Sequence, residues 1–355
     1  MLEPLYESQF SDHSHGFRPN RSCHTALSMA KQYIEEGCEW VVDIDLKDFF
    51  NKVNHQRLMA RLGLDISDKR ILWLISRMLR TKTVMPDGVK VSNEEGVPQG
   101  SPLSPLLSNI VLDELDRELI QRGLHFVRYA DDCNIYVRSQ RAGQRVFASV
   151  KRFIEVKLRL EINIQKSAVA KPEERHFLGF SLRRDPLHGE VQILLSKRSI
   201  ERIADKTREL TPRNYGGSMR ECIKRLNGYL VGWSGFFHIC TEDVLWNLNR
   251  IDAHNRRRLR AIQLKHWPLP VIHDLCGTAT SDWKRKRTIA RELIKRGGKP
   301  STVWSGIYSQ NRSFWKLSHI PIVDRTLNVA YWSDQGLRLL KDLWEVKNCS
   351  TLEWV

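Results

Sequence analysis

Hydrophobic and polar positions follow a strand-like pattern at several places in the first half of this 355-residue chain. Residues 40–46, WVVDIDL, alternate apolar with acidic side chains and predict a strand. Residues 124–138, LHFVRYADDCNIYVR, predict two strands joined by a polar Ala-Asp-Asp tip, and HFLGFSL at 176–182 predicts a further strand. Helical spacing over 54–62, 68–79 and 144–160 adds helices, so the first half mixes hairpins with helices.

The segment GVPQGSPLSPLLSNIVLDEL at 96–115 combines a loop with a helix. Its Gly/Pro/Ser-rich start predicts a loop, and Ser104–Pro105 predicts an N-cap followed by Pro at the first helical position. From there apolar residues recur with helical spacing.

The pattern changes after Ser196, where helical periodicity dominates. Helices are predicted over about 196–210, 218–237, 242–266, 284–296 and 334–346. The change of pattern places a domain boundary near 190–196.

The two parts of the chain also differ in net charge, which is far more positive after residue 190. Residues 1–190 hold 28 basic and 26 acidic residues, whereas residues 191–355 hold 29 basic and 15 acidic ones together with nine of the eleven tryptophans. A basic, tryptophan-rich segment indicates a polyphosphate partner bound by charge and by stacking. An inert basic surface is the alternative.

Several classes of protein are disfavoured by the sequence. The seven cysteines are scattered without a C-x-x-C pair, which argues against a zinc ribbon and a disulfide framework. The chain has no run of 18 apolar residues and opens without a secretory signal pattern, so we expect no membrane association and a cytoplasmic location.

Acidic residues carry the candidate chemistry. Asp43 and Asp45 lie two positions apart on the predicted strand and therefore face the same way, and Asp131 and Asp132 form an adjacent pair at the hairpin tip. Three carboxylates from two elements could hold two hard cations for phosphoryl transfer. Solvated turn aspartates are the alternative, although Asp45 between Ile44 and Leu46 is costly unless it is paired or bound to metal.

Six sequence blocks in order resemble those of group II intron-encoded reverse transcriptases. FVRYADDCNIYV resembles the Tyr-Ala-Asp-Asp hairpin of that family, and DIDLKDFFNKVNH (43–55) resembles its first catalytic block. EGVPQGSPLSPLLSNIVLDELD (95–116) is similar to the template- and nucleotide-binding block. The remaining matches are HGFRPNRSCHTAL (15–27), LRLEINIQKSAVA (158–170) and HFLGFSL (176–182).

The resemblance implies roles for individual residues, with Mg²⁺ as the cofactor. Asp45, Asp131 and Asp132 would be the catalytic metal ligands, which leaves Asp43 as an auxiliary or structural acid. The implied nucleotide-binding residues are Phe50 (the steric gate against a 2′-hydroxyl), Gln99, Gly100 and Lys166. The implied primer grip comprises Phe177, Leu178, Gly179 and Phe180. As alternatives, Phe50 could be a core aromatic residue, and the primer-grip residues could form a buried strand.

The second half is similar to the maturase-specific (X, or thumb) domain of the same family. The similarity runs from RNYGGSMRECIKRLNGYLVGWSGFF to NRRRLRAIQLKHW, within residues 213–267. The implied RNA-binding residues are Arg18, Arg256, Arg257, Arg258, Arg260 and Lys265, with a solvated helix face as the alternative for the helical ones. We expect a palm with partial fingers at 1–192, a maturase domain at 193–270 and a basic C-terminal region at 271–355.

Three departures from the family pattern stand out. The chain opens just before the GFRPNRS block, so we expect an N-terminal truncation that removes the fingers. The segment PLPVIHDLCGTATSD after Trp267 indicates an inserted loop or a remnant of sequence decay. Some members of the family end in an H-N-H endonuclease domain with paired cysteines; because no such cysteine pairs follow residue 300, we expect no such domain. We expect packing or surface roles for His254, His266, His273, His319, Trp304, Trp315 and Trp332.

The expected fold class is therefore α+β: a reverse-transcriptase palm with a mostly antiparallel sheet and flanking helices, a helical thumb and a basic tail. The expected function is RNA-directed DNA polymerisation with intron maturase activity, in group II intron splicing and retrohoming. The expected partners are group II intron RNA and an RNA template with a DNA primer, with a homodimer or a complementing N-terminal fragment as further candidates. The alternatives are a non-catalytic RNA-binding maturase, a decayed fragment, a retron- or CRISPR-linked reverse transcriptase, and a DNA-templated polymerase.

Overall fold

The computed structural model describes residues 2–81, 83–84, 90–91, 95–98, 100–186, 188–212, 214–267 and 321–349, with residues 271, 288, 290, 291, 294 and 295. The chain divides into two compact units, Met1–Ile193 and Leu194–Val355. The first unit combines a sheet with helices, and the described part of the second is mostly helical. This mixture of helices and antiparallel strands confirms the predicted α+β class.

A four-stranded antiparallel sheet forms the centre of the first unit. Its strands in spatial order are β4 (His125–Tyr129), β5 (Asp132–Val137), β1 (Trp40–Ile44) and β6 (Ala168–Ala170). The last registered pair between β1 and β5 joins Ile44 to Cys133. The register therefore brings the end of β1 beside the tip of the β4–β5 hairpin.

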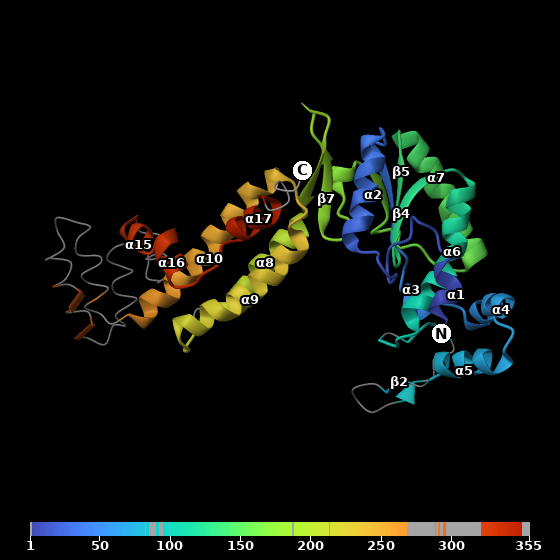
Figure 1. Ribbon diagram of the computed structural model, residues 1–355, viewed down its shortest axis with the longest axis horizontal. Coiled ribbons are helices and arrows are strands. Elements are labelled where there is room, and N and C mark those ends of the chain that lie inside the picture. The colour runs from blue at the N-terminus through green and yellow to red at the C-terminus, as the bar shows by residue number, and fades with distance from the viewer. Residues whose placement is uncertain are drawn as a thin grey trace. The chain divides into compact units, whose positions relative to one another are not determined.

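Helices cover both faces of this sheet (Figure 1). On one face α2 (Cys23–Glu35) lies against β4 and β5, where Tyr33 packs against Tyr136. On the other face α7 (Gln140–Phe153) packs so closely that a Cβ added to Gly143 would lie 2.5 Å from a methyl of Val169. The same face carries the main hydrophobic core, which includes side chains from α6 (Ser104–Gln121).

The remaining elements of the first unit are short helices and strands. They are α1 (Glu3–Glu7), α3 (Phe49–Lys52), α4 (His55–Asp65), α5 (Lys69–Leu79), the π-helical turn Ile154–Leu158 and the 3₁₀ turn Pro172–Glu174. Two further two-stranded sheets pair β2 (Thr83–Val84) with β3 (Lys90–Val91), and β7 (Phe180–Arg184) with β8 (Val191–Leu195).

Local chemistry explains where the predicted elements hold and where they differ. Asp68 caps α5, which begins within one residue of the predicted range, and its carboxylate accepts the Arg70 N–H at 2.8 Å. The N-cap prediction for Ser104 is wrong: α6 begins at Ser104 itself, and its hydroxyl donates to the Pro98 carbonyl instead. The strand predicted over 176–182 is also shorter, because a tight turn precedes β7 at Phe180.

The described part of the second unit is built on long helices. They are α8 (Lys197–Leu210), α9 (Met219–Phe237), the 3₁₀ turn Glu242–Val244, α10 (Leu245–His266), α15 (Pro321–Thr326), α16 (Val329–Asp334) and α17 (Leu340–Cys349). The serines before α8 and α9, Ser196 and Ser218, accept the N–H of Ser199 and Glu221 and so cap these helices. Among the helices that the structure describes, none combines the length and apolar character needed to cross a bilayer.

Candidate active site

Four aspartates gather at the end of the central sheet. Asp43 lies on β1, and Asp45 follows that strand directly. Because Ile44 pairs with Cys133, the next position places Asp45 beside Asp132, the first residue of β5. The hairpin tip itself consists of Ala130 and Asp131, so the predicted three-residue tip is one residue shorter and Asp132 belongs to the strand.

The charges of these aspartates act on one another. Partial removal from water, followed by the charges of Asp131, Asp43 and Asp45, raises the pKa of Asp132 to about 6. The Asp132 side chain remains exposed at the start of β5, so burial removes only part of its hydration and the neighbouring carboxylates add to the rise. Burial, with the charge of Asp45, also raises the pKa of Asp131. The site therefore concentrates more negative charge than its surroundings neutralise.

Asp45 is held by the segment that follows the π-helical turn. Its backbone N–H donates to the Ser167 hydroxyl at 2.9 Å, and its carbonyl accepts the Asn163 N–H at 2.8 Å. The Lys166 ammonium lies 3.7 Å from an Asp45 carboxylate oxygen. Both side chains are accessible to solvent, so this ion pair is weak and Asp45 stays available to another cation.

The donor set suits a hard divalent cation by its chemistry. Carboxylate oxygens are the ligands that Mg²⁺ prefers, and a cation would relieve the carboxylate repulsion that, after burial, raises the pKa of Asp132. In the arrangement of the described residues, however, no three His, Cys, Asp or Glu side chains converge closely enough to enclose a metal ion. Donor type and charge fit the cation, while a complete coordination shell is not formed.

Asp43 has a different partner from Asp45, which sequence reasoning did not identify. The Arg175 guanidinium donates through both Nε and Nη2 to one Asp43 carboxylate oxygen, at 2.8 and 2.5 Å. Burial raises the pKa of Asp43, and the bonds from Arg175 oppose that rise. Asp43 is thus a structural acid that ties β1 to the segment preceding the predicted primer grip.

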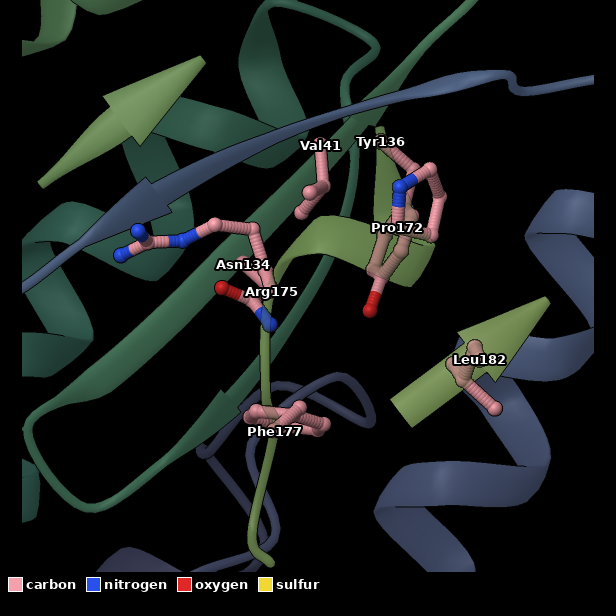
Figure 2. A pocket seen from close by; sticks show the side chains of 7 residues that line it. All are labelled: Val41, Asn134, Tyr136, Pro172, Arg175, Phe177 and Leu182. Atoms are coloured by element: carbon pink, nitrogen blue, oxygen red, sulfur yellow. The ribbon is translucent and has the colours of Figure 1, made fainter. Parts of the chain in front are cut away.

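A small cavity of about 10 Å³, close to the volume needed for one water, lies beside this ion pair. Figure 2 shows its lining residues, which come from β1, β5 and the 172–182 segment. They are Val41, Asn134, Tyr136, Pro172, Arg175, Phe177 and Leu182. The cavity is too small for a nucleotide, so it belongs to the packing of this segment against the sheet.

The segment around Gly96 docks closely on α3. Gly96 has φ +88°, and a Cβ there would lie 2.9 Å from backbone atoms of Phe50 and Asn51. The Gly96 N–H donates to the Val53 carbonyl at 2.7 Å, and the Gly96 carbonyl bonds the His55 ring at 2.6 Å. Only glycine allows this approach, which fixes the predicted nucleotide-binding block beside the first catalytic block.

Two predicted nucleotide-binding residues take contrasting positions there. Phe50 is half-buried and packs edge-on against Phe49, with ring centroids 5.2 Å apart, so it has both a packing role and an accessible surface. Gly100 is exposed with φ +86°. Gln99 lies outside the described residues.

The predicted primer grip is a tight turn. Phe177 and Phe180 exchange two backbone hydrogen bonds of 2.9 Å, and the two residues between them both have positive φ, +53° at Leu178 and +92° at Gly179. That geometry is a type I′ turn. Phe177 and Phe180 are buried, whereas Leu178 and Gly179 are half-buried. Only the two central residues are therefore placed to touch a ligand.

Three of the arginines predicted to bind RNA are buried instead. Arg18 donates to Glu7 and to the carbonyls of Ser11 and Ser14, and only 4% of its side chain is exposed. Arg258 donates to the hydroxyl and carbonyl of Thr211, and Arg260 pairs with Asp324. These contacts correct the prediction, because the three guanidinium groups are engaged within the fold.

The other predicted basic residues remain accessible. Arg256 and Arg257 are half-buried on α10, and Lys265 is exposed near its end. Trp332 is fully buried, in agreement with a core role. Burial, with nearby arginines, lowers the pKa of His254 to about 4, consistent with a packing role. Four further predicted residues lie outside the described part of the chain: His273, His319, Trp304 and Trp315. The predicted inserted loop, except residue 271, and most of the helix predicted over 284–296 also lie outside it.

Two protein families match successive parts of this chain. The family "Reverse transcriptase (RNA-dependent DNA polymerase)" matches residues 1–182, and "Group II intron, maturase-specific domain" matches residues 200–274. Protein YkfC of Escherichia coli is 30% identical over 233 residues, which cover 54% of this chain and 61% of that protein. The group II intron-encoded protein LtrA of Lactococcus lactis is 41% identical over 128 residues, 36% of this chain and 21% of that protein.

A solved telomerase from Candida albicans aligns over 93% of this chain and 56% of that one, at 10% identity and a TM-score of 0.44. This likeness is too distant to define the fold further. The chain spans less than two thirds of the length of the curated relatives that it matches. Because the first family matches more than half of the residues, the chain belongs to the reverse transcriptase (RNA-dependent DNA polymerase) family, and a group II intron maturase-specific domain follows in the same chain.

Proposed function

We propose that this chain is an RNA-directed DNA polymerase with maturase activity, acting in the splicing and retrohoming of a group II intron. The observation that carries the proposal is the group of four aspartates at the end of the sheet. Partial burial, followed by the charges of the other three aspartates, raises the pKa of Asp132 to about 6, and a divalent cation would relieve the repulsive part. Membership of the reverse transcriptase family supports the same chemistry.

Asp45, Asp131 and Asp132 would hold Mg²⁺ in this proposal. When bound, the metal would neutralise charge on the triphosphate and lower the pKa of the primer 3′-hydroxyl. The carboxylates themselves would position the cation from two places, the residue that follows β1 and the β4–β5 hairpin. Asp43 takes no part in metal binding, because Arg175 already occupies its carboxylate.

Neighbouring residues would select and orient the substrates. The accessible surface of Phe50 would exclude a 2′-hydroxyl on the incoming nucleotide, and Gly100 would allow the triphosphate to approach the backbone. Lys166, 3.7 Å from Asp45, would contact the triphosphate. Leu178 and Gly179, at the centre of the type I′ turn, would contact the primer.

The partners follow from the second unit and from the relatives. Arg256, Arg257 and Lys265 remain accessible for phosphate contacts along α10. The name of the Lactococcus lactis relative, a group II intron-encoded protein, favours an intron RNA as the bound molecule. We place the activity in the cytoplasm with an RNA template and a DNA primer, and a homodimer or a complementing fragment remains a prediction from the sequence.

A second candidate function is a maturase that binds intron RNA without polymerising. It is favoured by one observation: among the described residues, no three potential ligands converge to enclose a metal ion. In that case Lys166 would be the lasting partner of Asp45, and the second unit would carry the function.

Primer extension on an oligo(dT)-primed poly(rA) template with Mg²⁺, beside filter binding to structured RNA, separates the two. We expect extension by the wild-type chain and a loss of about two orders of magnitude or more in Asp131→Asn, with RNA binding unchanged. Salt-sensitive RNA binding without any extension by the folded wild-type chain would contradict polymerisation and leave the second candidate.

A further inference from the structure

A buried arginine contacts the hairpin tip that Ala130 and Asp131 form. Arg128, on β4 three residues before Asp131, is fully buried, and so is Asp116 on α6. The guanidinium bonds both Asp116 carboxylate oxygens, through Nε at 2.7 Å and Nη2 at 2.5 Å. This two-pronged pairing fixes the orientation of the guanidinium plane.

The remaining N–H groups of Arg128 are also satisfied. Nη1 donates to the Asn109 side-chain carbonyl at 3.0 Å and to the Ala130 backbone carbonyl at 2.8 Å, and Nη2 donates to the Ser14 hydroxyl at 2.8 Å. All five donors of the guanidinium therefore have acceptors. One acceptor, the Ala130 carbonyl, belongs to the turn that carries Asp131.

That turn has a conformation that needs support. Ala130 has φ +56°, in the left-handed region that a residue with a Cβ rarely adopts. Such a conformation persists where surrounding contacts over-determine it. The bond from Arg128 to the Ala130 carbonyl supplies one such contact from below the tip.

A second contact supports the turn from the 13–16 segment. Ser14 pairs with Arg128 in a parallel bridge, and the Gly16 carbonyl accepts the Asn109 side-chain amide at 2.9 Å. A Cβ at Gly16 would lie 2.2 Å from the Ala130 nitrogen. Gly16 thus lies flush against the turn, and Asn109 joins it to the same buried cluster.

We propose that Arg128 is a positioning residue for the metal ligands: its guanidinium, oriented by Asp116 and Asn109, fixes the Ala130 turn and so aims the Asp131 and Asp132 carboxylates. Gly16 is the second half of this support, because its missing side chain lets the 13–16 segment close against the turn. This inference rests on the proposed metal-dependent polymerase function. It adds a cluster that binds neither substrate nor metal and acts through the geometry of the turn.

Two variants test the cluster by independent routes. Removing Arg128 alone would leave Asp116 buried and unpaired, so the first variant combines Arg128→Met with Asp116→Leu, which replaces a buried ion pair by apolar side chains. The second, Gly16→Ala, keeps every charge and pushes on the Ala130 backbone. Leu119→Ala is the matched control, because Leu119 is fully buried on the same helix and lies outside the cluster.

The first readout is binding of Mn²⁺, followed by electron paramagnetic resonance on the full chain without nucleic acid. We expect Mn²⁺ to bind about tenfold or more weakly in both test variants, as for other residues that orient metal ligands, and unchanged in Leu119→Ala. The second readout is primer extension, in which kcat should fall and the required Mg²⁺ concentration should rise while the KM for nucleotide stays within about twofold.

The outcomes separate this inference from the proposed function. Wild-type affinity for Mn²⁺ in both folded test variants would overturn the positioning role, even if the wild-type chain polymerises. Equal weakening in Leu119→Ala would also overturn it, because the effect would then follow stability alone. If the wild-type chain neither binds Mn²⁺ nor extends a primer, the proposed function fails and the inference falls with it.

Discussion

Single carboxylates in this chain differ by the partner that each one finds. Asp43 and Asp45 are two positions apart, and only the family resemblance distinguished them in the sequence; in the structure Arg175 donates two hydrogen bonds to the Asp43 carboxylate. Asp45 has only an exposed lysine at 3.7 Å. The difference assigns a structural role to Asp43 and leaves Asp45 free to bind a cation. The two roles are set by the pairing of Asp43 with Arg175, 132 residues away in the sequence, and no local sequence pattern reveals such a pairing.

The buried carboxyl of Asp252 should make the stability of the chain depend on pH. It is buried on α10 and accepts the N–H of Leu340 and Lys341 at the start of α17, and burial raises its pKa from 3.8 to about 6. Because the pKa is higher in the folded chain, the folded state binds the Asp252 proton more tightly than the unfolded state does. The stability that this difference contributes is fully present below about pH 4 and is lost as the pH rises through 6. A shift of about two units corresponds to at most about 3 kcal/mol.

We therefore expect the free energy of unfolding of the wild-type chain, relative to Asp252→Asn, to fall as the pH rises from about 4 to 7. Chemical denaturation at several pH values measures it, with the exposed Asp334→Asn as control. Parallel pH profiles for the wild type and Asp252→Asn would contradict the assignment.

Among the elements, the docking of the Gly96 segment on α3 has a measurable cost. In Gly96→Ala, the added Cβ would meet backbone at 2.9 Å in a left-handed conformation. We expect a loss of stability of about 1–2 kcal/mol or more, seen as a lower Tm. Gly63→Ala is the matched control: it lies in α4 with open space at its Cβ and should be neutral or stabilising by up to about 1 kcal/mol. An equal Tm for both variants would refute the close docking.

The ion pair between Asp43 and Arg175 joins β1 to the turn at Leu178 and Gly179. In Arg175→Gln this link is lost, so the turn should shift from the strand, and we expect the KM for primer to rise about tenfold, equivalent to 1.4 kcal/mol. Primer titration at saturating nucleotide measures it. Arg183→Gln, an exposed arginine on β7 that bonds Gln192, should behave as the wild type. A normal primer KM in Arg175→Gln would show that the ion pair serves stability alone.

Elements with a strong local signal were predictable, and those set by tertiary contacts were not. The apolar pattern in WVVDIDL and on both sides of the Ala-Asp-Asp tip predicts β1 and the hairpin correctly, because most positions of these strands are buried. The N-cap prediction failed because the Ser104 hydroxyl donates a hydrogen bond to the Pro98 carbonyl and so does not cap the helix. The primer grip reads as a strand from composition, whereas the positive φ of Leu178 is fixed by its surroundings. Likewise, Arg18, Arg258 and Arg260 look like a basic surface in sequence but are buried.

Over the whole molecule, the excess of positive charge lies after residue 190. Since Arg258 and Arg260 are buried, the accessible cations on α10 should carry the electrostatic part of RNA binding. We expect Lys265→Gln to weaken RNA binding modestly and to reduce the slope of log K against log salt by about one, with an unchanged Tm. Arg258→Gln should lower the Tm, because Thr211 loses its partner. An unchanged salt slope in Lys265→Gln would remove this residue from the interface.

In the proposed function, carboxylates at the end of the sheet catalyse DNA synthesis on an RNA template. The most direct measurement is the single-turnover rate of one-nucleotide incorporation on a poly(rA)–oligo(dT) duplex, compared between the wild type, Asp45→Asn and Glu161→Gln. Glu161 pairs with Lys47 beside the same strand end but is 65% exposed and lies outside the aspartate group. We predict a fall of at least about 100-fold for Asp45→Asn and a wild-type rate for Glu161→Gln. Equal rates for the wild type and Asp45→Asn would contradict the account.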